Sequence, residues 1–573
     1  MPTIQETLVR LLTEAAEAAA PDLGLDPADV PEPELSRPRQ KEHGDWASNI
    51  ALVLAKAAGR SPREVASAIV ANLPIDDAQV RSAEVAGPGF INLRLGPGWL
   101  HDILADVLTR GNAFGFKEQS RSERVQVEFV SANPTGPLHV GTARNAAIGD
   151  SLADVLEAAG WDVEREYYFN DAGRQMELFG ASVEARYLQH LGVDAAMPAD
   201  GYQGQSIGEV ADRIAVARGT ELLDLPPDAR RAAILKEAVE LTLAGIRETL
   251  ERFRIRFDTW FSESALHHGA IDEAVQRLRD KGLAYDADGA VFFKSTAYGD
   301  DKDRVLIRSN GIPTYFGADC AYLLDKFGRG FDRVIYVWGA DHHGDMARMH
   351  GAAEALGIDP QRITILLYQL VSLYRGGEPV RMSKRTGDVV TLDELIDEVG
   401  TDAARYTLLT RSPDSPLDFD IEAVTRQTMD NPVYYVQYAH ARTASLRRVA
   451  ERQGIALQAW KREQFDALSE EAELDLLRKL GEFPEMVELA ADTLAPHRLT
   501  RYVEQLAAAF HRFYTECRVI TDDDALTQAR LWLSEATHQV IASALGLLGV
   551  SAPESMQRLD TAAETETNDA DAV

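Results

Sequence analysis

Apolar positions in residues 1–105 predict two kinds of element in turn. The stretches IQETLVRLLTEAAEAAA and DWASNIALVLAKAAG repeat apolar residues at helical spacing. The strand-like runs VRSAEVA and FINLRL then stand on either side of Gly87-Pro88-Gly89, which marks a tight turn. The pattern predicts a small N-terminal α+β domain.

Between residues 120 and 425 short apolar runs alternate with helical stretches. VQVEFV precedes AAIGDSLADVLEAAG, RVIYVWGA precedes MARMHGAAEALG, and ITILLYQL follows. Such alternation is typical of a doubly wound, Rossmann-like parallel sheet with crossover helices. Residues 185–255 lack obvious strands and are interpreted as a helical insertion into this domain.

Helical periodicity continues without interruption from residue 426 to 551. NPVYYVQYAHARTASLRRVA, LTRYVEQLAAAFHRFYTECRV and QARLWLSEATHQVIASALGLLG are the longest such stretches. Consecutive amphipathic helices predict an all-α bundle. Residues 552–573 are acidic and poor in apolar side chains, so we expect a disordered tail. The whole pattern predicts a multidomain α/β protein.

Composition narrows this picture only slightly. The chain has no run of about 18 apolar residues, so we expect no transmembrane helix. The first residues lack the basic and apolar blocks of a signal peptide, and Cys320 and Cys517 offer neither a disulfide framework nor a cysteine zinc site. A cytoplasmic protein is the simplest interpretation. The net charge of −32 does not exclude RNA, because binding depends on the local face that meets the phosphates.

The loop from Ser131 to Thr142 lies between a predicted strand and a predicted helix. Ligands bind past the carboxyl ends of strands in open α/β sheets, where a helix N-terminus offers free N–H groups to phosphate. Gly141 lets a nucleotide approach the backbone, and His139 can donate to a phosphate oxygen. The alternative is a turn whose prolines only shape the chain.

A second loop, from Val380 to Gly387, follows Gly376 and Gly377. Its sequence VRMSKRTG combines a lysine, a serine hydroxyl and a glycine. A loop of this kind can close over a triphosphate and stabilise departing pyrophosphate. The alternative is a solvated basic surface loop.

The two loops together resemble the signatures of class I aminoacyl-tRNA synthetases. PLHVGT resembles the HIGH signature and RMSKR the KMSKS signature, in the same order and with a long separation. Further blocks resemble the arginyl-tRNA synthetase family in particular: KEHGDWASN, AGPGFIN, VEFVSANPTGPLHVG, REYYFNDAGRQ, WFSES, YFGADCAY, WGADHHGD, YYVQYAHAR and AFHRFYTECRV. The resemblance covers nearly the full length except the acidic tail.

The resemblance implies a ligase that activates arginine with ATP and transfers it to tRNA(Arg) through arginyl-adenylate. It places ATP in contact with Pro137, His139, Gly141, Thr142, Met382, Ser383 and Lys384, and gives catalytic roles to His139, Thr142, Arg381, Ser383 and Lys384. Two positions depart from the family pattern. Thr142 replaces the second histidine of HIGH, and a threonine hydroxyl is shorter and carries no charge. Arg385 replaces the last serine of KMSKS.

An arginine pocket must pair a planar cation with carboxylates, because an unpaired buried guanidinium is costly. The resemblance implies that Asp319 binds the guanidinium with help from Tyr315, four residues away, and Glu263 is a plausible second carboxylate. Other family positions around the amino acid are Glu128, Ser131, Asn133, His139 and His342. The alternatives are structural ion pairs for the carboxylates and core packing for Tyr315.

Asp341-His342-His343 is the segment that invites a metal interpretation. Adjacent histidines leaving a strand point in different directions, and no third ligand stands at useful spacing. We therefore expect no protein-bound zinc. Mg²⁺ is expected to enter with ATP, held mainly by phosphates and water.

Recognition of RNA is expected to use exposed bases and shape. The helix beginning near Asn431 carries aromatic and cationic groups able to stack on splayed bases, namely Tyr434, Tyr435, Tyr438, His440 and Arg442. The alternative for the tyrosines is core packing. The resemblance implies anticodon recognition by this bundle and contact of Asn49 with the tRNA elbow. It also implies a monomer, with no DNA or membrane partner.

Three rival functions remain open at this point. A cysteine-specific class I enzyme would carry zinc-ligand cysteines, and one for large aliphatic amino acids a longer editing insertion. Other nucleotidyl transferases with a HIGH-like loop lack the helical bundle and the N-terminal module. A catalytically inactive tRNA-binding protein is favoured only by Thr142, whereas His139, Tyr315, Asp319 and Lys384 argue against it.

Overall fold

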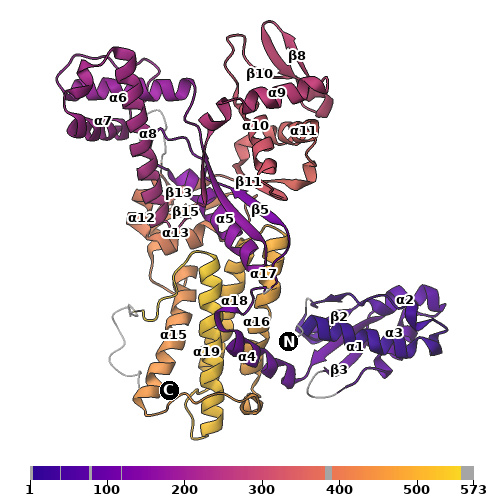
Figure 1. The fold of residues 1–573 in the computed structure, drawn as a ribbon. Coiled ribbons are helices and arrows are strands. Elements are labelled where there is room, and N and C mark those ends of the chain that lie inside the picture. The colour runs from indigo at the N-terminus through magenta and orange to yellow at the C-terminus, as the bar shows by residue number, and fades with distance from the viewer. Residues whose placement is uncertain (1–3, 39, 76–79, 118, 381–389, 557–573) are drawn as a thin grey trace.

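The computed structural model describes residues 4–38, 40–75, 80–117, 119–380 and 390–556. A small N-terminal unit lies beside a bundle of long helices, and a parallel sheet lies at one end of that bundle (Figure 1). Two lobes project from the sheet on opposite sides, one carrying α6 and α7 and the other β8 and β10. The sheet therefore lies between the helical bundle and the two lobes.

The N-terminal unit packs helices on an antiparallel sheet with the strand order β1-β2-β4-β3. Leu8, Trp46 and Ile91 belong to its separate buried core. The sequence prediction of an α+β fold is thus confirmed. Its elements are α1 (Ile4–Ala19), β1 (Leu35–Ser36), β2 (Trp46–Ser48), α2 (Ile50–Ala58), α3 (Pro62–Ala71), β3 (Val80–Ala86) and β4 (Phe90–Leu95).

The central sheet has the strand order β12-β11-β5-β6-β7, and each neighbouring pair is parallel. Strand β11 (RVIYVWG) is nearly continuously apolar because parallel strands are covered on both faces, whereas the inner strands β5 and β6 also bury polar residues such as Gln126 and Glu166. The predicted doubly wound sheet is confirmed. Its strands are β5 (Arg124–Glu128), β6 (Asp162–Phe169), β7 (Thr259–Ser262), β11 (Arg333–Gly339) and β12 (Ile363–Tyr368).

Helix α5 (Val140–Ala158) contacts both the sheet and helices of the bundle, and nearly all of its residues are buried. Helices α10 (Tyr315–Gly328) and α11 (Met346–Leu356) pack with β11 and β12 around a second core. A helical lobe inserted between β6 and β7 has its own small core. It consists of α6 (Arg174–His190), α7 (Gln205–Arg218) and α8 (Pro227–Arg252).

The opposite lobe contains a small antiparallel sheet that the sequence pattern did not predict. Its strands follow the order β10-β9-β8 and lie between α9 and α10 in the chain. Each strand is only four residues long, which is too short for a clear period of alternation. The elements are α9 (Ala270–Asp280), β8 (Ala284–Ala287), β9 (Ala290–Phe293) and β10 (Arg304–Ile307).

Short elements connect the sheet to the bundle, and Arg405 fastens them together. Its fully buried guanidinium pairs with Asp150 on α5 at 2.6 Å and donates to the carbonyls of Phe253, Arg254 and Leu548. A buried cation of this kind is stable only when all its donors are paired. The connecting elements are β13 (Val371–Arg375), β14 (Glu378–Pro379), α12 (Leu392–Val399), α13 (Thr401–Leu408), β15 (Leu417–Asp420) and α14 (Ile421–Thr425).

The C-terminal bundle packs long helices side by side (Figure 1), as the sequence predicts. Helix α4 (Pro97–Arg110) leaves the N-terminal unit and packs on this bundle, where both ring nitrogens of His101 contact the 466–468 segment. The bundle helices are α15 (Pro432–Arg452), α16 (Glu471–Gly481), α17 (Phe483–Asp492), α18 (His497–Glu516) and α19 (Asp524–Leu547). Among the described helices, none is long and apolar enough to cross a membrane.

Local predictions in the N-terminal unit have mixed outcomes. The turn at Gly87-Pro88-Gly89 is confirmed, and a Cβ on Gly89 would lie 2.6 Å from Cβ of Pro62 at a backbone φ of +142°. The expected helix over DWASNIALVLAKAAG is wrong at its start, because Trp46–Ser48 forms strand β2 and the helix begins at Ile50. Pairing of β2 with β4 overrides the local helical pattern.

Candidate active site

The loop after β5 is held in an unusual conformation by one asparagine. Val130 and Ser131 have φ of +65° and +41°, a region that non-glycine residues enter at a cost of about 1 kcal/mol or more. Asn145 on α5 accepts a hydrogen bond from Val130 N at 2.6 Å and donates to Val337 O at 2.8 Å. The loop is therefore fixed between α5 and the end of β11.

The end of this loop presents the N-terminus of α5, whose positive dipole end favours anions. His139 is the N-cap residue, and its carbonyl accepts from Thr142 N at 2.8 Å. A Cβ on Gly141 would lie 3.0 Å from the His139 ring, so glycine leaves room for that imidazole. Pro137 is exposed, whereas the Thr142 side chain is 8% exposed in the first turn.

The two predicted motifs are joined through backbone pairing. Val140 N donates to Val390 O at 3.1 Å, and Leu392 N donates to Leu138 O at 2.8 Å. At the other side, Val380 N donates to Leu373 O at 2.8 Å. Both flanks of the second loop are thus placed, and one lies directly on the first loop. The predicted residues Arg381, Met382, Ser383, Lys384 and Arg385 lie outside the described residues.

Acidic side chains gather at the carboxyl ends of β5, β6 and β7, which are neighbours in the sheet. Glu128 ends β5, and Glu263 follows β7; both are buried. The Tyr168 hydroxyl on β6 donates to Glu263 Oε2 at 2.6 Å, and burial raises the pKa of Glu263. Burial and the charges of Glu263, Asp319 and Glu128 raise the Tyr168 pKa, so the phenol stays a donor.

Asp319 on α10 faces these two glutamates. Burial, together with the negative charges of Glu263 and Glu128, raises the pKa of its carboxyl from 3.8 to about 8. Its carboxylate accepts no hydrogen bond and forms no ion pair within the part of the chain that the structure describes. Tyr315, one turn earlier on the same helix, is 58% exposed. Asp319 is therefore a carboxyl group without a partner among the described residues, and a cation bound beside it would favour its ionised form.

A neighbouring network of buried charges, in contrast, is fully paired. Lys326 Nζ lies 2.9 Å from Glu128 Oε2 and 3.0 Å from Glu166 Oε1. Arg329 Nη1 lies 2.6 Å from Glu166 Oε2, and these cations lower the pKa of Glu166 to about 2 in spite of its burial. Sequence reasoning missed Lys326, although it stands seven residues after Asp319 and so on the same helical face.

The remaining predicted arginine-site residues lie around this acidic region. Ser131 Oγ donates to Glu128 Oε1 at 3.1 Å and accepts from Tyr168 N at 3.2 Å. Asn133 Nδ2 donates to Gln175 Oε1 at 2.6 Å, at the start of the inserted helical lobe. His342 follows β11 in a 3-10 turn, half exposed, with Nδ1 3.1 Å from Asp345. Each of them therefore lies beyond the carboxyl end of a sheet strand.

The predicted RNA-contacting residues differ in accessibility. Tyr434 is 7% exposed and stacks on the partly exposed Tyr438, with ring centroids 6.1 Å apart. Arg442 Nη2 donates to the hydroxyl of Tyr514 at 2.7 Å. Asn49 Nδ2 donates to Glu34 at 3.0 Å in the N-terminal unit. Tyr438 and Arg442, both partly exposed, are thus more accessible than Tyr434.

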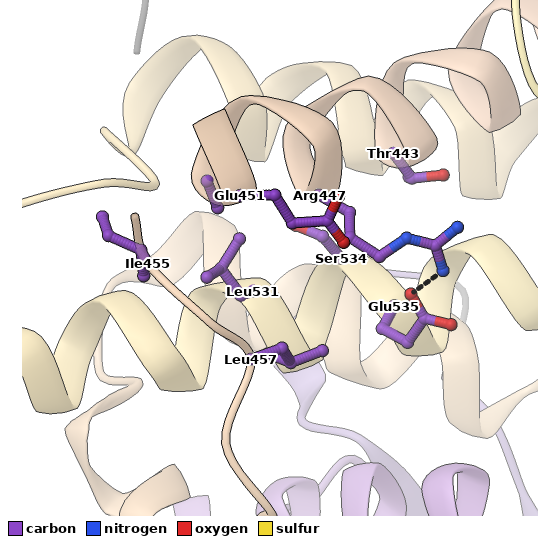
Figure 2. Close-up of a pocket in the computed structure, with 9 residues that line it drawn as sticks. Thr443, Arg447, Glu451, Ile455, Leu457, Leu531, Ser534 and Glu535 are labelled. Carbon is purple, nitrogen blue, oxygen red and sulfur yellow. Dashed lines mark hydrogen bonds and ion pairs between the residues drawn. The ribbon is translucent and has the colours of Figure 1, made fainter. Parts of the chain in front are cut away.

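A cavity of about 20 Å³ lies in the bundle between α15 and α19, far along the chain from the predicted motifs (Figure 2). Arg447 points across it to Glu535, 3.4 Å away, and Ile455, Leu457 and Leu531 form its apolar wall. The volume is that of about one water molecule, so this cavity is too small for a nucleotide or an amino acid.

Three family models match the chain. Arginyl tRNA synthetase N terminal domain matches residues 4–95, tRNA synthetases class I (R), catalytic domain, matches residues 103–444, and DALR anticodon binding domain matches residues 436–556. The central model alone spans more than half of the sequence, and it contains Glu128, Glu263 and Asp319.

Named proteins and a solved structure are also similar to this chain. The arginine–tRNA ligase of Desulforudis audaxviator is 51% identical over 550 residues, covering 96% of this chain and 98% of that protein. That of Moorella thermoacetica is 50% identical over 560 residues, covering 97% and 100%. The arginyl-tRNA synthetase structure from Thermus thermophilus has a TM-score of 0.72 at 24% identity, covering 96% of this chain and 100% of that one. At this level of identity, the similarity to the Thermus thermophilus structure shows a shared fold.

Proposed function

The chain belongs to the class I arginyl-tRNA synthetase family and is an arginine–tRNA ligase, and we propose how its residues divide the work of that reaction. The enzyme joins ATP, L-arginine and tRNA(Arg) to give L-arginyl-tRNA(Arg), AMP and diphosphate. Residues 1–105 hold the tRNA elbow, residues 120–425 carry out the chemistry, and residues 426–551 bind the anticodon.

Arginine is selected by Asp319 and Glu263. The observation that carries this assignment is the position of the Asp319 carboxyl near Glu263 and Glu128 with no hydrogen bond or ion pair of its own among the described residues, so that a bound cation would favour its ionised form. A guanidinium supplies that cation and several donors in a fixed plane, whereas the ammonium of lysine cannot fill a two-pronged site. Tyr315, half exposed beside Asp319, covers the guanidinium from the solvent side.

Lys326 and Tyr168 prepare the pocket without contacting the guanidinium. Lys326 neutralises Glu128, so that Glu128 and Ser131 can face the α-amino end of the substrate together with Asn133 and His342. The hydroxyl of Tyr168 fixes one oxygen of Glu263. Carboxylates that are already held in the binding geometry lose less conformational entropy when arginine binds, which increases the affinity for arginine.

Activation begins when the arginine carboxylate attacks the α-phosphorus of ATP. The nucleotide lies over Pro137 and Gly141, with its phosphates at the N-terminus of α5. His139 donates to the phosphate, and Thr142 acts through its hydroxyl, directly or through water. Lys384, with Arg381, Met382 and Ser383, neutralises the departing pyrophosphate. The pairing of Val390 with Val140 supports this role, because it ties the second loop to the first.

Transfer follows from the adenylate to the 2′-hydroxyl of the terminal adenosine of tRNA. Tyr438 and Arg442 read the anticodon loop with Tyr434 behind them, and Asn49 contacts the elbow. Mg²⁺ enters on the phosphates of ATP and keeps most of its waters. The enzyme works as a monomer in the cytoplasm.

Arginine-dependent ATP–pyrophosphate exchange tests these roles. Wild-type protein is expected to exchange only with both arginine and tRNA(Arg), and canavanine should compete better than lysine, because it retains the planar head group. Exchange that proceeds equally with lysine would contradict the assignment of Asp319 and Glu263. A folded protein that binds tRNA without any exchange would instead favour an inactive tRNA-binding protein.

A further inference from the structure

Two histidines and one glutamate converge at the C-terminal end of the described chain. His440 lies on α15, His538 on α19, and Glu554 in the segment that follows α19. One ligand atom from each lies within 4.8 Å of the others, and the two imidazole rings have centroids 3.9 Å apart. The residues are widely separated in sequence, so no spacing rule could have found them.

The hydrogen bonds of His440 define which ring nitrogen carries its proton. Nδ1 lies 2.9 Å from the carbonyl oxygen of Pro553, which can only accept, so Nδ1 is the donor. Nε2 of the neutral His440 ring is then unprotonated and carries a lone pair. His440 is 1% exposed, and its Nε2 has no hydrogen-bond partner among the described residues. An unpaired polar atom at this depth is costly unless a ligand satisfies it.

The same reasoning applies to His538 through Thr443. The Thr443 hydroxyl donates to His440 O at 2.6 Å, so it accepts from Nδ1–H of His538 at 3.0 Å. Nε2 of His538 is thus the ring atom that faces Glu554 Oε1, 3.3 Å away. Two imidazole Nε2 atoms and a carboxylate face one another, an arrangement that a shared cation, whether a proton or a metal ion, stabilises.

We infer that His440 Nε2, His538 Nε2 and Glu554 bind a divalent late first-row transition-metal ion, of which Zn²⁺ is the preferred occupant. Two imidazoles and one carboxylate are a common Zn²⁺ ligand set, with the fourth position left to water. The outer contacts are already in place, because Pro553 O and Thr443 Oγ1 hold the remote ring nitrogens. Such support raises the basicity of the ligands.

Binding requires a small contraction around the ion. Ligand atoms about 2.0–2.2 Å from zinc lie about 3.4 Å from one another in a tetrahedron, so the stacked rings must spread while their nitrogens converge. The Glu554 side chain is 57% exposed and can move toward the ion, because its other ion pair, with Arg447, is long at 3.9 Å. Figure 2 shows Arg447 turned toward Glu535, so Arg447 divides its charge between Glu535 and Glu554.

A metal ion at this position would fasten the 551–556 segment to the bundle. That segment already contacts α15, because Gln437 donates to Ser551 O at 2.9 Å and Arg448 donates to Glu554 O at 3.1 Å. The role is structural, and it is independent of the arginine pocket. This inference differs from the expectation of no protein-bound zinc, which considered only the cysteines and the Asp341–His343 segment.

Titration of the full chain, first freed of metal by a chelator, with Co²⁺ and then Zn²⁺ tests the inference. We expect one equivalent of Co²⁺ with the visible absorption of a tetrahedral site, displaced by Zn²⁺. Glu554→Gln and His538→Asn should each weaken binding at least tenfold, and circular dichroism would verify that both variants fold. His190→Asn is the matched control, because His190 pairs with Asp212 at 2.6 Å on the surface.

Three outcomes would overturn the inference: less than one equivalent of metal bound, equal uptake by wild type and both variants, or loss of uptake in the His190 control. A His538 ring that titrates normally by NMR and ignores added Zn²⁺ would show that a proton alone joins it to Glu554. Arginine-dependent exchange by the same preparation separates this failure from any failure of the proposed active site.

Discussion

Two carboxylates in contrasting surroundings, Glu473 in the bundle and Asp319 in the active site, show how differently the two regions treat charge. Glu473 is fully buried, with Arg530 Nε 2.6 Å from its Oε1 and two backbone N–H groups, of Ser469 and Glu470, each 2.8 Å from its Oε2. Asp319 accepts no hydrogen bond within the described part of the chain and faces two other carboxylates.

The difference separates a group that stabilises the fold from one reserved for a substrate. Breaking a buried, fully paired ion pair costs stability, whereas an unpaired carboxylate lowers stability until its ligand arrives. The bundle therefore pairs the charge of Glu473 within the protein, whereas the catalytic domain leaves the carboxyl group of Asp319 for the arginine substrate. Four measurements test this contrast, in order of decreasing effect.

Asp319→Asn should have the largest effect. The amide removes the charge that pairs with the guanidinium, and loss of one partner of such a pair costs about 3–5 kcal/mol, so kcat/KM for arginine should fall about a thousandfold. Thermal stability should stay equal near pH 7, because no hydrogen bond or ion pair of Asp319 within the described residues is lost, and should rise above pH 8, where the wild-type carboxylate is ionised without a partner. Pyrophosphate exchange and melting curves measure the two effects. A large loss of stability would place Asp319 with Glu473 as a structural group.

Glu473→Gln should have the opposite result, a loss of stability without a loss of arginine use. It leaves Arg530 buried without a counter-charge, so the free energy of unfolding of the bundle should fall by about 3–5 kcal/mol. KM for arginine should not change in the remaining folded enzyme. Glu14→Gln in the exposed Arg10–Glu14 pair is the control, with an expected change below about 0.5 kcal/mol. Equal effects from both substitutions would contradict the comparison.

Tyr168→Phe should lower kcat/KM for arginine about tenfold, mainly through KM, with KM for ATP unchanged. It removes the 2.6 Å hydrogen bond that orients Glu263, and one such charge-assisted bond contributes about 1.5–3 kcal/mol. Tyr406→Phe is matched chemically, because Tyr406 donates to Glu504 at 3.0 Å next to the bundle. Its effect should be on stability alone; a shared loss in arginine KM would argue against a local role for Tyr168.

The pH dependence of arginine use should show the smallest effect. With a pKa of about 8, Asp319 is ionised in only a minor fraction of free enzyme at pH 7, so kcat/KM for arginine should rise about fivefold between pH 7 and pH 8 and level off above. The folded state holds this proton longer than the unfolded state does, so the same shift lowers stability as pH rises from about 4 to 8. Asp319→Asn should flatten that decline. A pH-independent kcat/KM in wild type would refute the shift.

Sequence patterns could predict the elements that have long or regular periodicity. The strand β5, the helix α5 and the bundle helix α15 follow from apolar periodicity, and the loop from Ser131 to Thr142 follows from its place between two of them. Glu128, Glu263 and Asp319 could be named from motifs, but their mutual approach depends on the neighbouring order of β5, β6 and β7. That order is a tertiary property.

Other features depend on contacts that no local pattern encodes. Lys326 lies in an ordinary helix sequence and gains its role only by reaching Glu128 and Glu166 from across the sheet. The pairing of Val390 with Val140 joins segments about 250 residues apart. The short strands of the β8–β10 sheet and of β2 form because a partner strand is available, which local periodicity does not report.

The buried Arg405 has a consequence for the order of folding during synthesis. The N-terminal unit has a separate core and can fold once Trp99, the last residue of that core, has emerged from the ribosome. Two partners of Arg405, Asp150 and Phe253, are synthesised before it. The acceptor of its Nε–H, the carbonyl of Leu548, is synthesised much later, near the end of the chain. Until Leu548 is made, the buried Nε–H of Arg405 lacks its acceptor, so this contact between the catalytic domain and the C-terminal bundle is completed only late in translation.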